Sequence, residues 1–559
     1  MIGPVARFSV VLALAACMFS AQAHDGRNTP LPQPPRLAQA EDTPAVQSDA
    51  AVCALTLRLV DPAGNAIPGL VQLVNASGQT IRPAALLPRT AALSERSEGA
   101  AAHGWMNRWY VLPGERTIDV PAEEIVIAAF SGIASRRSEI TVDLRGKRIA
   151  EVAVPIAPLA PALSGRWVAG NVHLHLKDMN HAEAERYVTE VAMADRLDLV
   201  FLSYLERAGA DATYISNGFT RADLDRFESK SGIRYGWGEE YRHNFPGAPG
   251  YGHVMFLDLP ELILPASLGH AITKRGNDGG LLRPGIEAAR KQEATVLWCH
   301  NTRGHEDIPS WVAGLIDGQI IFDSGATGDY ASGFYRYLNI GIPVPISMGT
   351  DWFINDMAMT MVALEGEAAT APWLAALRAG RSWITNGTLL DFSVDDAAPG
   401  ARLARANGDT VKVRAAAAGR NDFLGVELVV NGRIVGGAAS EATDGGFAAT
   451  AEVEVPVDGS AWIAARITPF RGSYDRPEVL GVNFNEYGKP LFAHTSPVYI
   501  DVDGAPLFIP EAAESLIAEL RSSMVTIRHT GEYTNDAERE KVLSIYREAM
   551  AVLKAKLGG

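Results

Sequence analysis

The segment G-N-V-H-L-H-L-K-D-M-N-H, residues 170–181, decides how the rest of the chain is interpreted. His173 and His175 stand two residues apart in an apolar run, residues 168–176, that is typical of a buried strand. Side chains alternate between the two faces of a strand, so both imidazoles lie on one face. His181 follows where the chain turns into a helix. Two such imidazoles offer neutral nitrogen ligands to a metal ion, although two hydrogen-bonded core histidines would give the same pattern.

Length and composition limit the kinds of protein that this chain can be. Its 559 residues are too many for a single hydrophobic core, so about three domains are expected. A hydrophobic content of 47% and a charged content of 21% are typical of a globular protein. The formal net charge of -15 gives no support to nucleic-acid binding, which requires a basic surface.

The N-terminus predicts export from the cytoplasm. Residues 1–23 combine one cationic side chain, a largely apolar run and a small-residue cleavage site, A-Q-A, as a signal peptide does. We therefore expect a periplasmic or secreted protein with a disordered tether at 24–50. A lipoprotein is the alternative, because L-A-A-C at 14–17 resembles a bacterial lipobox that would place a lipid anchor on Cys17. No later segment is apolar enough to span a bilayer, so no transmembrane segment is expected after signal removal.

Changes in hydrophobic periodicity divide the remaining chain into four parts. Residues 51–163 and 389–504 show short alternating strands separated by turns, and each part predicts a β-sandwich domain. Residues 164–388 alternate apolar strands with amphipathic helices, which predicts an α/β domain with a parallel, barrel-like sheet. Residues 505–559 predict a helical tail.

The middle domain supplies the strands on which a site could be built. In an α/β barrel the catalytic side chains lie at the carboxyl ends of the strands. The expected strands are residues 167–175, 199–205, 233–241, 253–259, 295–300, 319–323 and 344–351. The expected helices are residues 182–196, 221–228, 282–292, 310–316, 331–338 and 371–379.

Histidines and carboxylates stand at nearly every one of these strand ends. As ordinary core residues, each would need a buried partner of its own. Convergence on one metal site accounts for all of them together. They are His173, His175, Glu239, Glu240, His253, His300 and Asp351, with His181 just beyond the first strand.

The order and spacing of these residues resemble the polymerase-and-histidinol-phosphatase (PHP) superfamily. Within it, the chain is similar to the exported metallohydrolases of the CehA/McbA-like family. The resemblance implies a distorted (β/α)7 barrel of the PHP type between N- and C-terminal β-sandwich domains. The phrases that carry it are G-N-V-H-L-H-L, G-E-E followed by G-H-V, a strand ending in C-H, G-T-D, L-R-A-G-R-S-W-I-T-N-G at 377–387 and A-H-T-S-P-V-Y at 493–499.

The resemblance also implies the ligands of two metal ions. His173, His175, Glu240 and Asp351 match the ligands of the first ion, and the glutamate is shared with the second. The second ion would be held by Glu240, His253 and His300. Adjacent strand residues point to opposite faces, so either Glu239 or Glu240 can face the site, and the G-x-E form of the family selects Glu240.

A third metal site of the family is incomplete in this sequence. His181 is its possible remnant, but Leu205 and Phe353 stand where two further histidines are expected, and neither can ligate a metal. We therefore predict two divalent ions, either Zn, Mn or Fe. Tyr204 replaces a family aspartate, and its hydroxyl is a candidate for contact with substrate or a metal-bound water. Asn171 replaces an aspartate that would orient an imidazole.

The resemblance implies hydrolysis by a hydroxide that bridges the two ions. Metal coordination lowers the pKa of water from about 15.7 toward neutrality. Asp351 is the best candidate to accept the proton of that water. Loops beyond the ligand-bearing strands are where substrate contacts are expected. They contribute His305 as a further catalytic candidate, and Arg303, Arg242 and His243 as substrate-binding candidates.

The leading hypothesis is an exported metal-dependent hydrolase that cleaves an ester, carbamate or amide bond. Its partner would be a small-molecule or cell-envelope substrate. Phosphoester hydrolysis by the same site is the closest alternative, and a degenerate, non-catalytic binding protein is an alternative of another class.

Overall fold

The computed structural model describes most of the chain after residue 50. The predicted signal peptide, the tether, Cys17, Arg303 and Phe353 lie outside the described residues. Within the described part, no helix is long and apolar enough to cross a membrane. The described residues are 51–89, 108–160, 163–177, 179–206, 214–245, 248–274, 276–300, 304–323, 329–352, 357–467, 484–487 and 489–558.

The first part of the described chain forms two β-sheets that share one core. Leu55, Leu57 and Leu59 alternate along β1 (Val52–Val60) with more exposed residues, so one face of this strand is buried. They pack in one cluster with Leu73 of the other sheet, as in a sandwich. One sheet contains β10 (Ile149–Pro155), β1 (Val52–Val60), β2 (Ala66–Ile67) and β7 (Arg116–Pro121). The other contains β5 (Leu87–Pro88), β6 (Tyr110–Leu112), β3 (Gly69–Asn75), β8 (Glu124–Phe130), β9 (Ser138–Asp143) and β4 (Thr80–Ile81).

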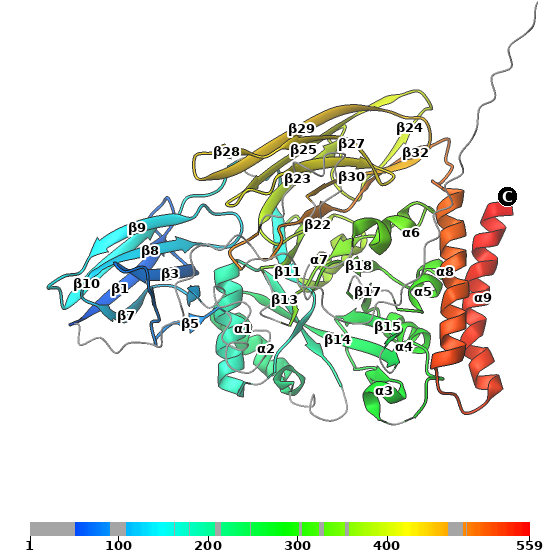
Figure 1. Cartoon of the computed structure of the whole chain (residues 1–559), viewed down its shortest axis with the longest axis horizontal. Coiled ribbons are helices and arrows are strands. Elements are labelled where there is room, and N and C mark those ends of the chain that lie inside the picture. Colours follow the sequence, from blue (N-terminus) through cyan, green and yellow to red (C-terminus); the bar gives the residue numbers. More distant parts are fainter. Residues whose placement is uncertain are drawn as a thin grey trace, which may run out of the picture. The chain divides into compact units, whose positions relative to one another are not determined.

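A large mixed sheet runs through the middle of the chain, and it confirms the α/β class (Figure 1). Its strands are in the order β19 (Ile346–Ser347), β18 (Gly318–Ile320), β17 (Thr295–Trp298), β15 (Ala248–Leu257), β14 (Arg234–Phe245), β13 (Leu199–Tyr204), β11 (Trp167–Asn171), β21 (Met359–Ala363) and β22 (Ser382–Thr385). β16 (Ser267–Leu268) pairs with β14 in the same sheet, and β12 (Leu174–His175) pairs in parallel with β20 (Asp351–Trp352) in a separate small one.

Helices follow most of these strands, as the periodicity predicted. Two of them begin with capping boxes, in which Asn180 and Thr220 satisfy the first free backbone N–H groups. The helical segments are α1 (His181–Asp195), η4 (Ile215–Gly218), α2 (Arg221–Ser231), α3 (His270–Thr273), α4 (Arg283–Lys291), α5 (Asp307–Val312), η5 (Ala331–Tyr335), α6 (Arg336–Leu338) and α7 (Thr370–Arg378).

β15 departs from the parallel order expected for this domain. It is antiparallel to both β14 and β17, whereas β11, β13 and β14 are mutually parallel. Its connection to β14, from Phe245 to Ala248, is too short for the crossover that parallel neighbours need. The resulting long hairpin brings Arg242 directly opposite His253.

The predicted second sandwich is divided between two sheets. A four-stranded sheet contains β23 (Thr388–Val394), β25 (Thr410–Gly419), β29 (Gly446–Pro456) and β28 (Glu441–Thr443). The other strands continue the large sheet beyond β22, and they are β31 (Ala493–Thr495), β30 (Ala461–Ile467), β26 (Gly425–Val430), β27 (Arg433–Ala439), β32 (Val498–Val502) and β24 (Arg402–Arg405). The two groups share buried residues such as Val413 and Leu428, so they enclose a common core.

The helical tail is confirmed as a hairpin of α8 (Pro510–Thr530) and α9 (Asp536–Gly558), which lie side by side (Figure 1). Apolar faces of both helices join a core cluster that also contains Trp298 at the end of β17. Polar contacts add to this packing. The Tyr251 hydroxyl lies 3.1 Å from the Tyr533 hydroxyl, and Arg336 donates to the Glu519 carboxylate over 2.9 Å.

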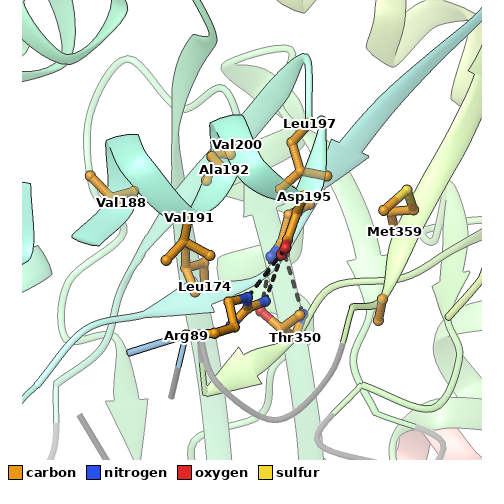
Figure 2. A pocket seen from close by; sticks show the side chains of 12 residues that line it. Arg89, Leu174, Val188, Val191, Ala192, Asp195, Leu197, Val200, Thr350 and Met359 are labelled. Atoms are coloured by element: carbon orange, nitrogen blue, oxygen red, sulfur yellow. Dashed lines mark hydrogen bonds and ion pairs between the residues drawn. The ribbon is translucent and has the colours of Figure 1, made fainter. Parts of the chain in front are cut away.

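A buried ion pair joins the first sheets to α1 (Figure 2). The Arg89 guanidinium donates to both oxygens of Asp195, over 3.2 and 2.6 Å, and the two side chains are 3% and 5% exposed. The Tyr187 hydroxyl donates to the Arg89 carbonyl. Removing one partner of such a pair leaves the other charge without compensation in a dry site.

The substitution Asp195→Asn tests the contribution of this ion pair to stability. We expect a loss of about 3 to 5 kcal/mol in the free energy of unfolding, because Arg89 keeps its charge and loses its counterion. A lower urea midpoint, followed by tryptophan fluorescence, would measure it. Asp501→Asn is the control, since its ion pair with Arg402 is half exposed and contributes about 1 kcal/mol or less. Equal midpoints for the two variants would contradict this account.

Candidate metal centre

The two histidines of the opening segment meet at the end of β11. The strand breaks after Asn171, whose side-chain oxygen accepts a hydrogen bond from the backbone N–H of His173 over 3.1 Å. The chain resumes as β12, so the predicted single strand is two short ones. The Nε2 atoms of His173 and His175 nevertheless lie 3.0 Å apart, and both rings are fully buried.

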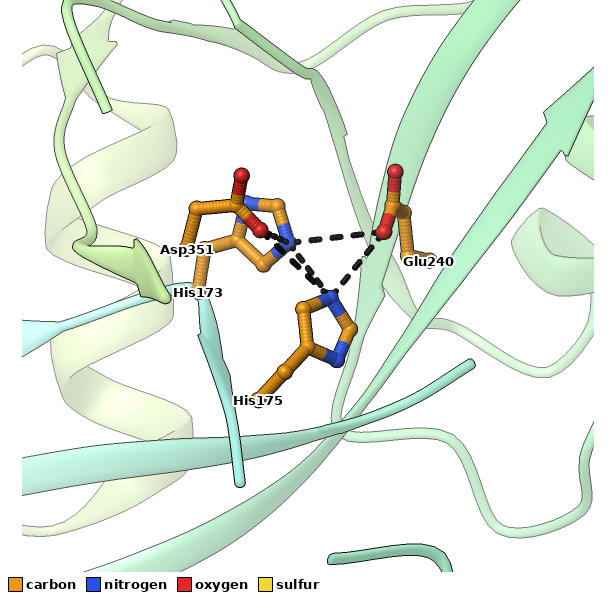
Figure 3. Close-up of side chains that lie close together, drawn as sticks. All are labelled: His173, His175, Glu240 and Asp351. Carbon is orange, nitrogen blue, oxygen red and sulfur yellow. Dashed lines mark hydrogen bonds and ion pairs between the residues drawn. The ribbon is translucent and has the colours of Figure 1, made fainter. Parts of the chain in front are cut away.

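Glu240 faces this pair from β14, and Asp351 faces it from β20 (Figure 3). Glu240 Oε2 lies 3.0 Å from His175 Nε2 and 3.8 Å from His173 Nε2. Asp351 Oδ1 lies 3.5 Å from His173 Nε2 and 3.8 Å from His175 Nε2. Four ligand atoms therefore converge on one point, as the sequence predicted.

The protons in this group point away from its centre. His173 Nδ1 donates to Asp323 Oδ2 over 2.7 Å, and His175 Nδ1 donates to the Ser203 carbonyl over 3.0 Å. In a neutral imidazole this leaves an unprotonated lone pair on each Nε2. Two such lone pairs at 3.0 Å, together with two carboxylates, repel one another unless a proton or a metal ion lies among them. The donor set therefore fits a metal ion.

A second ligand group uses the other oxygen of Glu240. Its Oε1 lies 2.9 Å from His253 Nδ1 and 3.5 Å from His300 Nε2. His253 Nε2 donates to the Asn244 side-chain oxygen over 2.7 Å, so its Nδ1 carries a lone pair. Both Nδ1 and Oε1 are buried without a hydrogen-bond partner. Glu240 thus stands between two sets of metal-ligand atoms, with one oxygen toward each.

Asp323 is the functional candidate that the sequence analysis missed. It ends the segment after β18, and its two oxygens accept from His173 Nδ1 over 2.7 Å and from His300 Nδ1 over 2.9 Å. This side chain fixes the orientation of one imidazole from each ligand group. It takes the orienting role that Asn171 cannot supply. Its sequence signal was the same as that of the other candidates, an acidic residue at a strand end.

Strained backbone occurs at three segment ends near the site. His300, Phe322 and Asp351 have φ values of 54°, 58° and 55°, which residues other than glycine rarely adopt. Gly349 makes the approach of the last segment possible, because a Cβ there would lie 2.5 Å from the backbone nitrogen of His173. The G-T-D sequence therefore begins with the one residue that allows Asp351 to reach the histidines.

The charges of the site favour a cation at its centre. Burial disfavours protonated His173, but the carboxylates of Asp351, Asp323 and Glu240 outweigh burial and raise its pKa to about 9. Burial also opposes ionisation of Glu240, yet the surrounding cationic groups hold its pKa well below the usual value. Burial and the Arg242 guanidinium lower the pKa of His253 to about 3, so its imidazole stays neutral and able to ligate.

Access to the site differs between its two halves. The side chains of His173 and His175 are fully buried, whereas those of His253 and His300 are 16% exposed. Asp351, with 10% exposure, is the most accessible of the three carboxylates, since Glu240 and Asp323 are at 2% and 0%. The group that contains His253 and His300 is therefore the one open to solvent.

Of the predicted substrate contacts, the structure brings Arg242 to this site. Its Nη1 lies 3.5 Å from Glu240 Oε1. His243 points to the other face of β14, where its Nε2 bonds Asp278 over 3.1 Å. His305 lies against α8, with its Nδ1 3.0 Å from the Ser523 hydroxyl, and burial lowers its pKa to about 4. Among the described residues, neither His243 nor His305 belongs to a group that could hold a metal ion.

Tyr204 and His181 also lie outside these groups. Tyr204 pairs in register with Glu239, so the two side chains share the face opposite Glu240. Burial raises the pKa of the Tyr204 phenol, with a contribution from the charges of Glu206 and Glu239. His181 begins α1 with a side chain 45% exposed, and its Nε2 lies 3.5 Å from Asp223 Oδ1.

A scan against protein-family models gives no match, and no curated protein matches the sequence.

Asp323→Asn tests the orienting role of this carboxylate. An amide can accept from only one of the two imidazoles, so the other loses its fixed tautomer. We expect metal affinity to fall roughly 10- to 100-fold, measured by competition with a chelator of known affinity. Asp329→Asn, which alters an exposed aspartate, is the control. Unchanged affinity in the first variant would contradict the role.

Proposed function

We propose that this chain is a metal-dependent hydrolase of the PHP type, similar to the CehA/McbA-like family, that works with two divalent ions. The observation that carries the proposal is the position of Glu240, whose two oxygens face separate ligand groups. Shared carboxylates of this kind hold the paired ions of two-metal hydrolases. His173, His175 and Asp351 would complete the first set of ligands, and His253 and His300 the second.

The donor types support an ion that accepts both nitrogen and oxygen. Imidazole together with carboxylate suits Zn, Mn or Fe better than Ca or Mg, which prefer oxygen alone. His181 supports two ions rather than three, since it lies on the surface beside Asp223. The bound ions would supply Lewis acidity that lowers the pKa of water and polarises the bond to be cleaved.

The protein's own residues would orient the reactants and accept a proton. Asp323 and the Ser203 carbonyl keep the Nδ1 protons of the buried histidines pointing outward. Asp351 is the best placed proton acceptor, because its carboxylate is the most accessible of the three at the site. The buried walls exclude bulk water, which strengthens the electrostatic contribution of each group.

The proposal includes the bond type and the place of action. We expect an ester, carbamate or amide substrate, met outside the cytoplasm if the N-terminal segment acts as a signal peptide. Phosphoester hydrolysis is a second candidate, and the buried guanidinium of Arg242 beside the second ligand group favours it. The parallel order of β11, β13 and β14 supports a barrel of the PHP type, in which β15 and β21 would be antiparallel strands.

His173→Ala tests the metal requirement. Chain purified without chelator should carry about two ions per molecule by elemental analysis, and should hydrolyse p-nitrophenyl esters or phosphates. The variant should bind less metal and lose activity by at least about 100-fold, as expected when a first ligand is removed. Chelation should abolish wild-type activity, and added metal should restore it.

His529→Ala is the matched control, since this histidine is exposed on α8. It should keep both metal content and activity. A metal-loaded wild-type chain that cleaves neither substrate class would contradict the hydrolase proposal and favour a binding protein. Full activity of the His173 variant would contradict the assigned site.

A further inference from the structure

The guanidinium of Arg242 is buried at the candidate metal centre and makes no hydrogen bond with the described residues. It follows Glu240 by two residues on β14, so both side chains lie on the same face of the strand. Its side chain is 10% exposed, and its Nε is buried without a partner. Among the described residues, the guanidinium has one ion-pair contact, in which its Nη1 lies 3.5 Å from Glu240 Oε1.

The other buried arginines of the described chain are satisfied differently. Arg89, Arg420 and Arg466 each donate to a buried carboxylate, on Asp195, Glu486 and Glu427 respectively. Their shortest contacts with these carboxylates are 2.6, 2.7 and 2.5 Å. Arg242 has no comparable counterion in the described part of the chain.

Glu240 cannot serve as that counterion while it ligates metal. The same oxygen, Oε1, also faces His253 Nδ1 at 2.9 Å and His300 Nε2 at 3.5 Å. An ion held by these atoms would take one lone pair of Oε1, would compensate the negative charge of the carboxylate and would itself repel the guanidinium. A desolvated guanidinium with five N–H donors and no acceptor is costly. The site therefore lacks negative charge at Arg242 when the metal is bound.

We propose that Arg242 binds an oxyanion of the substrate, so that the substrate carries a phosphate or carboxylate group at or next to the scissile bond. The inference rests on the proposed function for the cleavage itself. Arg242 lies in register with His253, whose side chain and that of His300 are the more exposed ligands, so the oxyanion would arrive from the open side. A planar guanidinium matches two oxygens of such a group bidentately.

Binding of inorganic phosphate to the metal-loaded chain, followed by isothermal titration calorimetry, tests the receptor directly. Arg242→Gln should weaken phosphate binding about 10- to 100-fold, the contribution of charge-assisted hydrogen bonds. Arg242→Lys keeps the charge but loses the bidentate geometry, and should fall between wild type and the glutamine variant. Arg234→Gln, at the exposed beginning of the same strand, is the control and should bind phosphate as wild type does.

Elemental analysis and circular dichroism of each variant show whether metal content and fold are kept. If the glutamine variant does not fold, the lysine variant decides. Phosphate affinity equal to wild type in a folded, metal-loaded Arg242 variant would overturn the proposal.

Substrate selectivity separates this inference from the proposed function. The substrates are p-nitrophenyl phosphate, mono-p-nitrophenyl succinate and neutral p-nitrophenyl acetate. The Arg242 variants should lower the ratio of kcat/KM for an anionic substrate to that for the neutral one by at least about 10-fold. A loss of kcat/KM for p-nitrophenyl phosphate alone would identify a phosphate group as the ligand of Arg242. A loss for mono-p-nitrophenyl succinate alone would identify a carboxylate. An unchanged ratio for both would overturn the inference, even if hydrolysis itself is confirmed.

If wild type cleaves no substrate but binds phosphate through Arg242, the hydrolase proposal fails and the oxyanion receptor stands.

Discussion

The carboxylate of Glu240 is buried between two groups of imidazoles, and the rest of the site is arranged around it. One of its oxygens lies 3.0 Å from His175, and the other lies 2.9 Å from His253. The Nδ1 protons of His173 and His175 and the Nε2 proton of His253 are donated elsewhere, so in the neutral rings lone pairs face lone pairs in a dry interior. Such a cluster is stable when positive charge is placed within it. This need for a cation is the physical reason for proposing a metal centre.

Two structural features of the fold produce this geometry. The β14–β15 hairpin carries Glu240 and His253 on neighbouring strands, and thereby joins the two ligand groups without a long loop. Asp323 ties His173 to His300 through their Nδ1 atoms, so a ring from each group is held by one carboxylate. The backbone at His300 and Asp351 has a positive φ, a strained conformation that is frequent at functional sites.

Much of the site could be predicted from the sequence because its residues lie at or near the ends of the expected strands, although the structure places Glu240 and His253 inside the longer strands β14 and β15. Histidines and carboxylates at strand ends converge in an α/β sheet whatever the length of chain between them, and this placed His173, Glu240 and Asp351 together. Asp323 was missed because an acidic residue after a strand is also a common turn residue. His305 followed a ligand strand closely, yet its partner Ser523 lies on the distant α8, and tertiary contacts of that kind leave no local pattern.

The fold was predicted in outline and not in its connections. Period-two and helical patterns identified the elements, but they do not specify pairing partners. The antiparallel direction of β15 and the continuation of the large sheet into β30 and β26 both follow from pairings between strands rather than from the strands themselves.

Anomalous X-ray diffraction from crystals of the metal-loaded chain, at the absorption edge of the bound metal, tests the central claim most directly. We expect two peaks, one on each side of Glu240, the first within bonding distance of His173 and His175 Nε2 and the second within that of His253 and His300. Absence of anomalous density at Glu240, or density elsewhere in the chain alone, would contradict the account.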